Sequence, residues 1–215
     1  MTPRRDLVLP LTLAFGLTLA LACDGGSEGK DGADLMATVE VAALEVDESS
    51  PGDVTMGDYP AGPYGTAVGS IAANHSFFNP ATKADISYGE LRAAGEKKLL
   101  LVTSGAGWCS ACKQEAVELK AKYDEYGPQG LEIWSTLFQD FVGDPADEGF
   151  WNVWKGQLTP NYPLLLDVDF VLGAYFNPDS APMNMLIDLE TMEILFLQTG
   201  FDPASVEAEI KKFLE

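Results

Sequence analysis

The chain has 215 residues and is 47% hydrophobic, so it can bury one sizeable core and is expected to form one domain with extensions. Its 33 acidic residues outnumber its 13 basic residues, which gives a formal net charge of −20. Because a surface this acidic cannot displace the counterions that surround phosphates, nucleic acid is not an expected partner.

The first 22 residues have the order of an export signal. Two arginines precede an uncharged stretch of mostly Leu and Ala, residues 7–22, which is short for a membrane-spanning helix of ~20 residues. Residues 19–23, L-A-L-A-C, resemble a bacterial lipoprotein signal, in which Cys23 is lipidated and becomes the mature N-terminus. Because Ala20 stands where leucine is usual, a plain cleaved signal peptide with an incidental cysteine is the alternative. The resemblance implies an exported lipoprotein, anchored to a membrane of the bacterial cell envelope.

The next segment, residues 23–56, is rich in Gly, Asp and Glu and predicts a flexible, acidic tether. Residues 57–69 alternate Gly, Pro and Tyr too densely for regular structure. We expect them to wrap the surface of a folded domain, residues 57–215. The expected organisation is thus a signal peptide, a lipidated tether, and one domain with an N-terminal extension.

Beyond this extension the hydrophobic pattern predicts alternating strands and helices. In chain order we expect a short helix or turn (86–94), a strand (98–103), a helix (109–126), a strand (131–138), a loop (140–147), a helix (148–158), a strand (164–166), a helical turn (174–176), a hairpin (183–189 and 193–197) and a helix from Asp202. Pro203 suits the first position of that last helix, whose buried face would be Val206, Ile210 and Phe213. This order predicts an α/β sandwich with a mixed central sheet and helices on both faces.

The sequence W-C-S-A-C at residues 108–112 follows an apolar run and precedes a predicted helix. This order places Cys109 at the N-terminus of the helix and Cys112 one turn inside it. Unpaired N–H groups and the macrodipole at that end favour a thiolate, so Cys109 is predicted to be a nucleophile. Cys112 is placed to resolve the mixed disulfide that Cys109 would form. A bridge across so short a loop constrains the unfolded chain little, which favours a catalytic role over a structural one.

Glu115 lies on the same predicted helix, at the border of its apolar stripe. The stripe is formed by residues three and four apart: Cys112, Ala116, Leu119, Tyr123 and Tyr126. At roughly 100° per residue, Glu115 is only about 60° from Cys112. Two interpretations stay open: a partly buried carboxylate near the sulfurs, or an ordinary solvated helix residue. If it is buried, desolvation should raise its pKa, and it could accept the proton of Cys112.

Together these features resemble the thioredoxin fold, and most of all the exported, membrane-tethered thiol–disulfide oxidoreductases related to cytochrome c maturation and to redoxins. Three matches within residues 77–215 carry the resemblance: W-C-S-A-C, Glu115 three residues after the second cysteine, and Ala181-Pro182 before the final hairpin. The resemblance implies a redox disulfide between the two cysteines and Glu115 as the proton acceptor. It also implies a cis bond before Pro182, which would cover the disulfide, and an Ala181 backbone that pairs with substrate. An ordinary trans proline is the alternative.

Two departures from the thioredoxin pattern concern the same site. Thr103 stands where many thioredoxins carry a buried aspartate, and Ser110-Ala111 replaces Gly-Pro between the cysteines. We expect Glu115 to replace the missing carboxylate. The redox potential of thioredoxin is not transferred to this chain, because known C-x-x-C proteins span ~150 mV.

The residues that other kinds of catalytic or binding site need are missing from the sequence. The single histidine, His75, excludes a His-based metal cluster or a Cys–His protease and is interpreted as a loop or surface residue. No nucleotide- or cofactor-binding motif occurs, so no cofactor is expected, and the peroxiredoxin pattern is missing around the first cysteine. The tryptophans at 134, 151 and 154 are predicted to be core residues. Trp108 is predicted to be a partly exposed platform for substrate beside the disulfide.

The sequence therefore predicts thiol–disulfide exchange with exported proteins or peptides, in the reducing direction by resemblance, and an upstream membrane redox partner. Three alternatives stay open. Cys109, Cys112 and either Met183 or Met185 would offer soft ligands for Cu(I). A thiol peroxidase-like redoxin, or a structural surface lipoprotein with an inert bridge, would also carry the motif.

Overall fold

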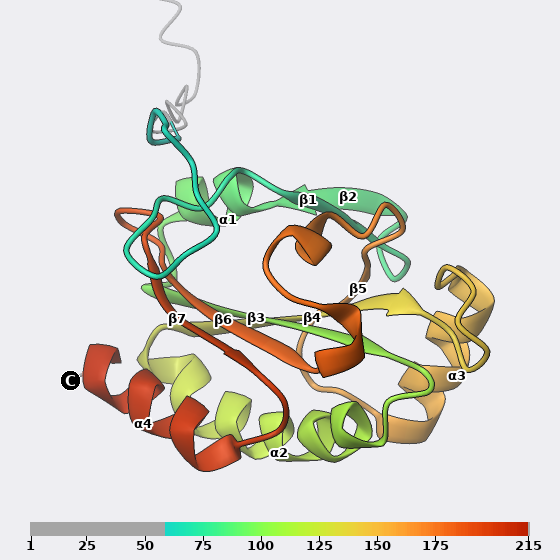
Figure 1. The fold of residues 1–215 in the computed structure, drawn as a ribbon. Helices are drawn as coiled ribbons and strands as arrows, with labels where there is room; N and C mark the ends of the chain where they lie inside the picture. Colours follow the sequence, from blue (N-terminus) through green and yellow to red (C-terminus); the bar gives the residue numbers. More distant parts are fainter. Residues whose placement is uncertain (1–58, 215) are drawn as a thin grey trace, which may run out of the picture. The chain divides into compact units, whose positions relative to one another are not determined.

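The structure is a computed structural model that describes residues 59–214 (Figure 1). The predicted signal peptide, the lipidation site Cys23 and the acidic tether lie outside these residues. Within residues 59–214, no helix is long and apolar enough to cross a membrane.

A seven-stranded mixed sheet carries the fold, in the order β2-β1-β5-β4-β3-β6-β7. The strands are β1 (Ser76–Asn79), β2 (Ala84–Ser87), β3 (Leu99–Ala106), β4 (Leu131–Gln139), β5 (Leu164–Leu166), β6 (Met183–Asp188) and β7 (Ile194–Thr199). β3, β4 and β5 run parallel, while β6 pairs antiparallel with both β3 and β7, and β1 pairs antiparallel with β5 and β2. The predicted mixed sheet and C-terminal hairpin are confirmed.

The buried strand β3 separates two apolar layers because its side chains alternate between the faces of the sheet. Leu99 and Leu101 face the layer that contains α2 (Ser110–Tyr126) and α4 (Pro203–Leu214). Leu100 and Val102 face the other layer, together with Tyr88 of α1 (Tyr88–Ala94). Figure 1 shows α2 and α4 along one face of the sheet and α1 on the other. The predicted sandwich is therefore present, with helices on both faces.

Polar side chains fix where two of the helices begin. Ser87 and Glu90 form a capping box at the start of α1, in which each side chain accepts a hydrogen bond from the other residue's backbone N–H. Asp147 caps α3 (Glu148–Leu158) by accepting from the N–H of Phe150 at 2.7 Å. α3 is held to β5 by Trp151, whose indole N–H donates to the carbonyl of Leu164 at 2.8 Å.

The N-terminal part of the domain differs from the sequence prediction. The hairpin of β1 and β2 was not expected, and residues 86–87 belong to its second strand rather than to a helix. The preceding segment has little regular structure, as expected, but it pairs with the sheet. The N–H of Gly69 donates to the carbonyl of Ile194 at 2.8 Å, and the N–H of Ile194 donates to Ser70 at 2.9 Å. The segment thus covers the beginning of the edge strand β7.

Candidate redox site

The two cysteines lie where β3 passes into α2. β3 ends at Ala106, and a short turn leads to Cys109, which is the N-cap of α2. Its Sγ accepts a hydrogen bond from the N–H of Cys112 at 3.0 Å. Cys109 therefore uses one of the free N–H groups of the helix end, as the sequence predicted.

A disulfide joins Cys109 and Cys112, with an S–S distance of 2.08 Å and a Cα–Cα distance of 5.3 Å. Both residues are buried, with 5% and 4% of their surface exposed. Cys109 Sγ also lies 3.5 Å from the carbonyl oxygen of Ala181. A disulfide sulfur has no proton to donate, so a hydrogen bond to this carbonyl requires the reduced thiol.

Two glycines next to the disulfide allow the backbone to approach closely. A Cβ on Gly105 would lie 3.3 Å from Cys112 Sγ, so any side chain there would press on the bridge. A Cβ on Gly107 would lie 2.5 Å from the backbone carbon of Asp140, which is closer than real Cβ contacts allow. Neither glycine could be recognised from the sequence, because the atoms that lie opposite them depend on the folded chain.

Trp108 is 41% exposed next to the buried disulfide, in agreement with the sequence prediction. Its indole N–H donates to Gln139 Oε1 at 3.0 Å, and its ring meets Phe138 edge to face at 6.3 Å. The ring is therefore fixed in place while part of its face remains open to solvent.

The bond between Ala181 and Pro182 is cis, and Pro182 is buried. The expected cis bond is confirmed, although the contact with substrate stays a prediction. The N–H of Ala181 donates to the carbonyl of Pro178 at 3.1 Å. It is thus already used within the protein, and the carbonyl of Ala181 is the backbone group left to face the sulfur and a substrate.

Glu115 is buried, with 5% of its surface exposed, so the interpretation as a solvated residue is wrong. Its Oε2 accepts a hydrogen bond from Thr103 Oγ1, and its Oε1 accepts one from Asn184 Nδ2, both at 2.5 Å. Burial raises the pKa of Glu115 from 4.5 to about 7, and the two hydrogen bonds act against this rise. The group can therefore gain and lose a proton near neutral pH.

The register of β3 brings Glu115 and Cys112 together on one face of the sheet. Thr103 and Gly105 are two residues apart on this strand, so they point to the same side. Thr103 contacts Glu115, and Gly105 lies against Cys112. Cys112 and Glu115 are also neighbours one turn apart on α2. The carboxyl group thus lies beside the inner cysteine.

Asn184 was missed by the sequence analysis, and Thr103 was noted only as a departure from the thioredoxin pattern. Asn184 lies on β6 and is fully buried, in a strand that is otherwise apolar up to its last residue. A polar residue two positions after Pro182, in the middle of such a strand, was the available signal. Its partner could not be deduced without the pairing of β6 with β3.

The remaining residues that the sequence singled out are buried or half-buried and contact other side chains of the fold. Met183 and Met185 are fully buried in β6, in the same hydrophobic cluster of buried side chains as the cysteines. His75 is half-buried, and its Nε2 lies 2.9 Å from the hydroxyl of Tyr175. The three tryptophans predicted as core residues are buried: Trp134, Trp151 and Trp154. Within residues 59–214 there is no group of three His, Cys, Asp or Glu side chains that could hold a metal ion.

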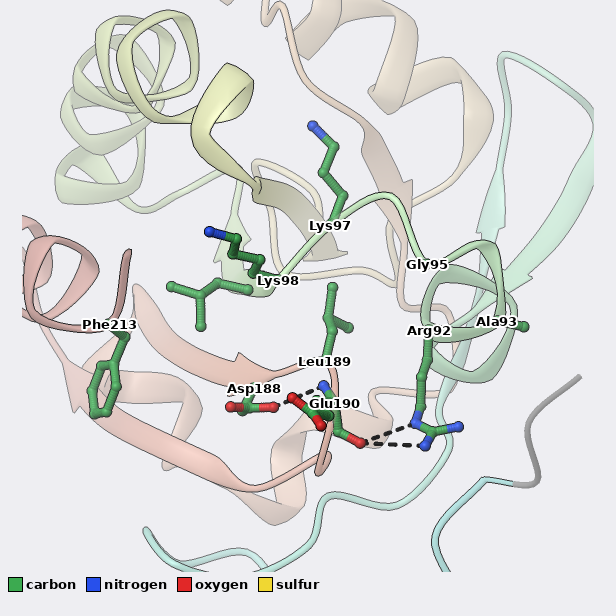
Figure 2. A pocket seen from close by; sticks show the side chains of 10 residues that line it. Arg92, Ala93, Gly95, Lys97, Lys98, Asp188, Leu189, Glu190 and Phe213 are labelled. Carbon is green, nitrogen blue, oxygen red and sulfur yellow. Dashed lines mark hydrogen bonds between the residues drawn. The ribbon is translucent and has the colours of Figure 1, made fainter. Parts of the chain in front are cut away.

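Figure 2 shows a pocket of about 540 Å³ at the end of the sheet where β3 begins and β6 ends. Arg92 crosses its rim and donates to the carbonyl oxygen of Glu190 at 3.3 Å. Lys98, Asp188 and Phe213 also line it. The disulfide follows the opposite end of β3, so this pocket belongs to a different part of the molecule.

Comparison with known proteins identifies the fold. No protein-family model and no curated protein match the chain. Among solved structures, it resembles a candidate thiol:disulfide interchange protein DsbE from Chlorobium tepidum (TM-score 0.59, 15% identity, 70% of this chain and 100% of that one). It also resembles the thioredoxin domain of a thiol-disulfide oxidoreductase from Bacteroides vulgatus (0.56, 20%, 70% and 100%) and a thiol:disulfide interchange protein from Bacteroides sp. (0.55, 18%, 69% and 90%). The chain therefore has the thioredoxin-like fold.

Proposed function

We propose that this protein is an exported thiol–disulfide oxidoreductase that acts on proteins or peptides through Cys109 and Cys112. The observation that carries the proposal is the disulfide at the N-terminus of α2, with a buried carboxyl group beside its inner cysteine. The N–H of Cys112, which donates to Cys109 Sγ, would stabilise a thiolate there after reduction. The similar solved structures support the proposal, because they include thiol:disulfide interchange proteins.

In the reducing direction, the Cys109 thiolate attacks one sulfur of a substrate disulfide. The substrate S–S bond breaks, its other sulfur leaves as a thiolate, and a mixed disulfide forms on Cys109. Cys112 then gives its proton to the Glu115 carboxylate and attacks Cys109 Sγ, which releases the second substrate thiolate. Two electrons pass from the protein to the substrate, and the Cys109–Cys112 disulfide forms. A dithiol on a membrane redox partner has to reduce it again.

The substrate would lie over three neighbours of the disulfide. The exposed face of Trp108 offers an apolar contact, and the buried cis Pro182 directly follows Ala181, whose carbonyl contacts Cys109. The carbonyl of Ala181, 3.5 Å from Cys109 Sγ, is placed to accept a hydrogen bond from the backbone of an extended substrate. Since the N–H of Ala181 is bonded to Pro178, this pairing would use one backbone hydrogen bond instead of two.

Export and membrane anchoring form part of the proposal and rest on the sequence. The signal in residues 1–22 and the cysteine at 23 support an exported lipoprotein whose acidic tether holds the domain away from the membrane. A domain attached to such a tether would have its redox site in the cell envelope, where substrate disulfides can form.

Trapping of the mixed disulfide tests the function. In a chain with Cys23→Ala, so that no other thiol is present, Cys112→Ser should accumulate substrates as adducts on Cys109. Cys109→Ser in the same background should trap none. The reduced protein should also reduce insulin, and either substitution should abolish turnover.

The alternatives predict different results. Inability to reduce insulin or oxidise a reduced peptide, with no adducts on Cys112→Ser, would contradict the proposal. A disulfide that resists mild reductant in the folded protein would favour an inert bridge. Stoichiometric Cu(I) binding that is lost on Met183→Leu would favour the copper site.

A further inference from the structure

The carboxyl group of Glu115 is held at both oxygens by neutral donors from the sheet. Thr103 Oγ1 on β3 donates to one oxygen and Asn184 Nδ2 on β6 donates to the other, each at 2.5 Å. These two residues are direct partners across the β3–β6 pairing. The sheet therefore presents a matched pair of donors to one side chain of α2.

The two donor residues are buried, as is the carboxyl group of Glu115 to which they donate. Asn184 is fully buried, and Thr103 is 3% exposed. Lys122, which lines the same small cavity as Glu115, forms its ion pair with Glu207 at 2.7 Å, and none of the ion pairs within residues 59–214 includes Glu115. Hydrogen bonds from Thr103 and Asn184 are thus the local stabilisation of a negative charge on this carboxyl group.

Asn184 also borders a cavity between α2 and α4. The cavity measures about 10 Å³, which is close to the space that one water needs, and Glu115, Glu118, Lys122 and Val206 line it too. Asn184 Oδ1 is buried and accepts no hydrogen bond from any of residues 59–214. A water in the cavity could donate to this oxygen and keep the amide turned with Nδ2 toward Glu115.

We propose that Asn184 and Thr103 are positioning residues for the proton step, and that they fix the orientation and the charge state of Glu115. Their donors favour the carboxylate, the form that accepts the proton of Cys112. The kinetic part of this inference rests on the proposed function.

Other titratable groups face Glu115 from each element packed around it. Cys112, Glu118 and Lys122 belong to α2, and Glu207 on α4 is the ion-pair partner of Lys122. Tyr162, between α3 and β5, donates to the carbonyl of Ala116, and burial, followed by the charge of Glu115, raises the pKa of this tyrosine. None of these groups donates a hydrogen bond to the carboxyl in the described structure, so the titration of Glu115 depends chiefly on burial and on the two donors.

Isosteric removal of each donor tests the proposal. Asn184→Leu and Thr103→Val keep the volume but remove a hydrogen bond to a charged group, so each should raise the pKa of Glu115 by about one unit or more. The readout is an NMR titration of the Glu115 carboxyl carbon in the oxidised full chain. Ser104→Ala is the matched control: Ser104 is buried beside Thr103, points to the other face of the sheet, and its hydroxyl has no partner in the described structure.

The kinetic arm measures the rate at which Cys112 resolves a mixed disulfide, across pH. Asn184→Leu should move the profile to higher pH and slow resolution about fivefold or more near pH 7, since a smaller fraction of Glu115 is ionised. In a Glu115→Gln background, Asn184→Leu should leave the profile unchanged.

Two results would overturn the inference: an unshifted Glu115 titration in both isosteric variants, or an equal slowing by Asn184→Leu with and without Glu115. The NMR titration does not depend on catalysis. A shifted titration in a protein that exchanges no disulfides would uphold the positioning roles and reject the proposed function.

Discussion

At the scale of single residues, Glu115 links the chemistry of the site to the stability of the fold. Its pKa is about 7 in the folded protein, against 4.5 for an exposed glutamate, because burial disfavours the charged form. Between these two values the folded state holds a proton that the unfolded state has lost. The stability due to this group is therefore fully present below the unfolded pKa and is lost as pH rises through the folded pKa.

Glu115→Gln should remove this pH dependence. The shift corresponds to about 3 kcal/mol, so from about pH 5 to about pH 8 the wild type should lose up to that much unfolding free energy relative to the variant. Denaturant unfolding of the oxidised proteins at both pH values measures the difference. Parallel losses in the two proteins would show that the carboxyl group does not titrate in this range.

Some residues of the site could be predicted from the sequence and others could not. The cysteines follow from the C-x-x-C spacing and the strand–loop–helix order, which are local features. The helical stripe placed Glu115 at the border between core and solvent but could not decide between them. The decision came from Thr103 and Asn184, which are 81 residues apart in sequence and meet only through the register of β3 and β6. Such a pairing is set by tertiary structure.

At the scale of elements, α2 and α4 are joined by a partly buried ion pair. Lys122 Nζ lies 2.7 Å from Glu207 Oε2, and the two side chains are 8% and 33% exposed. Hydrogen bonds from Lys122 and, secondly, from Lys211 lower the pKa of Glu207 from 4.5 to about 2. The stabilisation is therefore present above the unfolded pKa and is lost as pH falls through the folded pKa.

Glu207→Gln should destabilise the protein by about 1 kcal/mol near neutral pH, a value reduced for the exposure of Glu207 to solvent. The difference from wild type should shrink as pH falls through about 2, because the wild-type carboxyl then becomes neutral as well. Thermal unfolding at both pH values measures it. Glu209→Gln is the matched control, because Glu209 pairs with Lys212 at the surface. Equal effects of the two substitutions would mean that the α2–α4 pair adds nothing beyond surface charge.

The elements themselves were largely predictable, since long apolar runs and helix signals are local. α3 and β5 have the predicted bounds, residues 148–158 and 164–166. The hairpin of β1 and β2 was not predicted, because its strands have four residues each and two of the four residues of β2 are polar. Short strands of this kind are stabilised by their neighbours and carry little hydrophobic pattern of their own.

At the scale of the whole molecule, the segment before β1 closes one edge of the sheet. Residues 69–72 exchange backbone hydrogen bonds with Met192 and Ile194, around the start of β7. Ala72 is fully buried, and the hydroxyl of Tyr59 donates to its carbonyl at 2.9 Å. The N-terminal extension is therefore part of the folded domain. Its contacts reach β7, which pairs with β6, the strand that follows Pro182 and contains Asn184.

A chain that begins at residue 76 should consequently be less stable than one that begins at residue 59. The shorter chain loses three backbone hydrogen bonds to the turn and edge strand and the burial of Ala72, which together correspond to about 3 kcal/mol or more. Denaturant unfolding of both chains measures the difference. Ala72→Asp in the full chain should act in the same direction, because it places an unpaired charge in a fully buried position. Unfolding midpoints that agree among all these proteins would show that residues 59–75 lie on the domain without stabilising it.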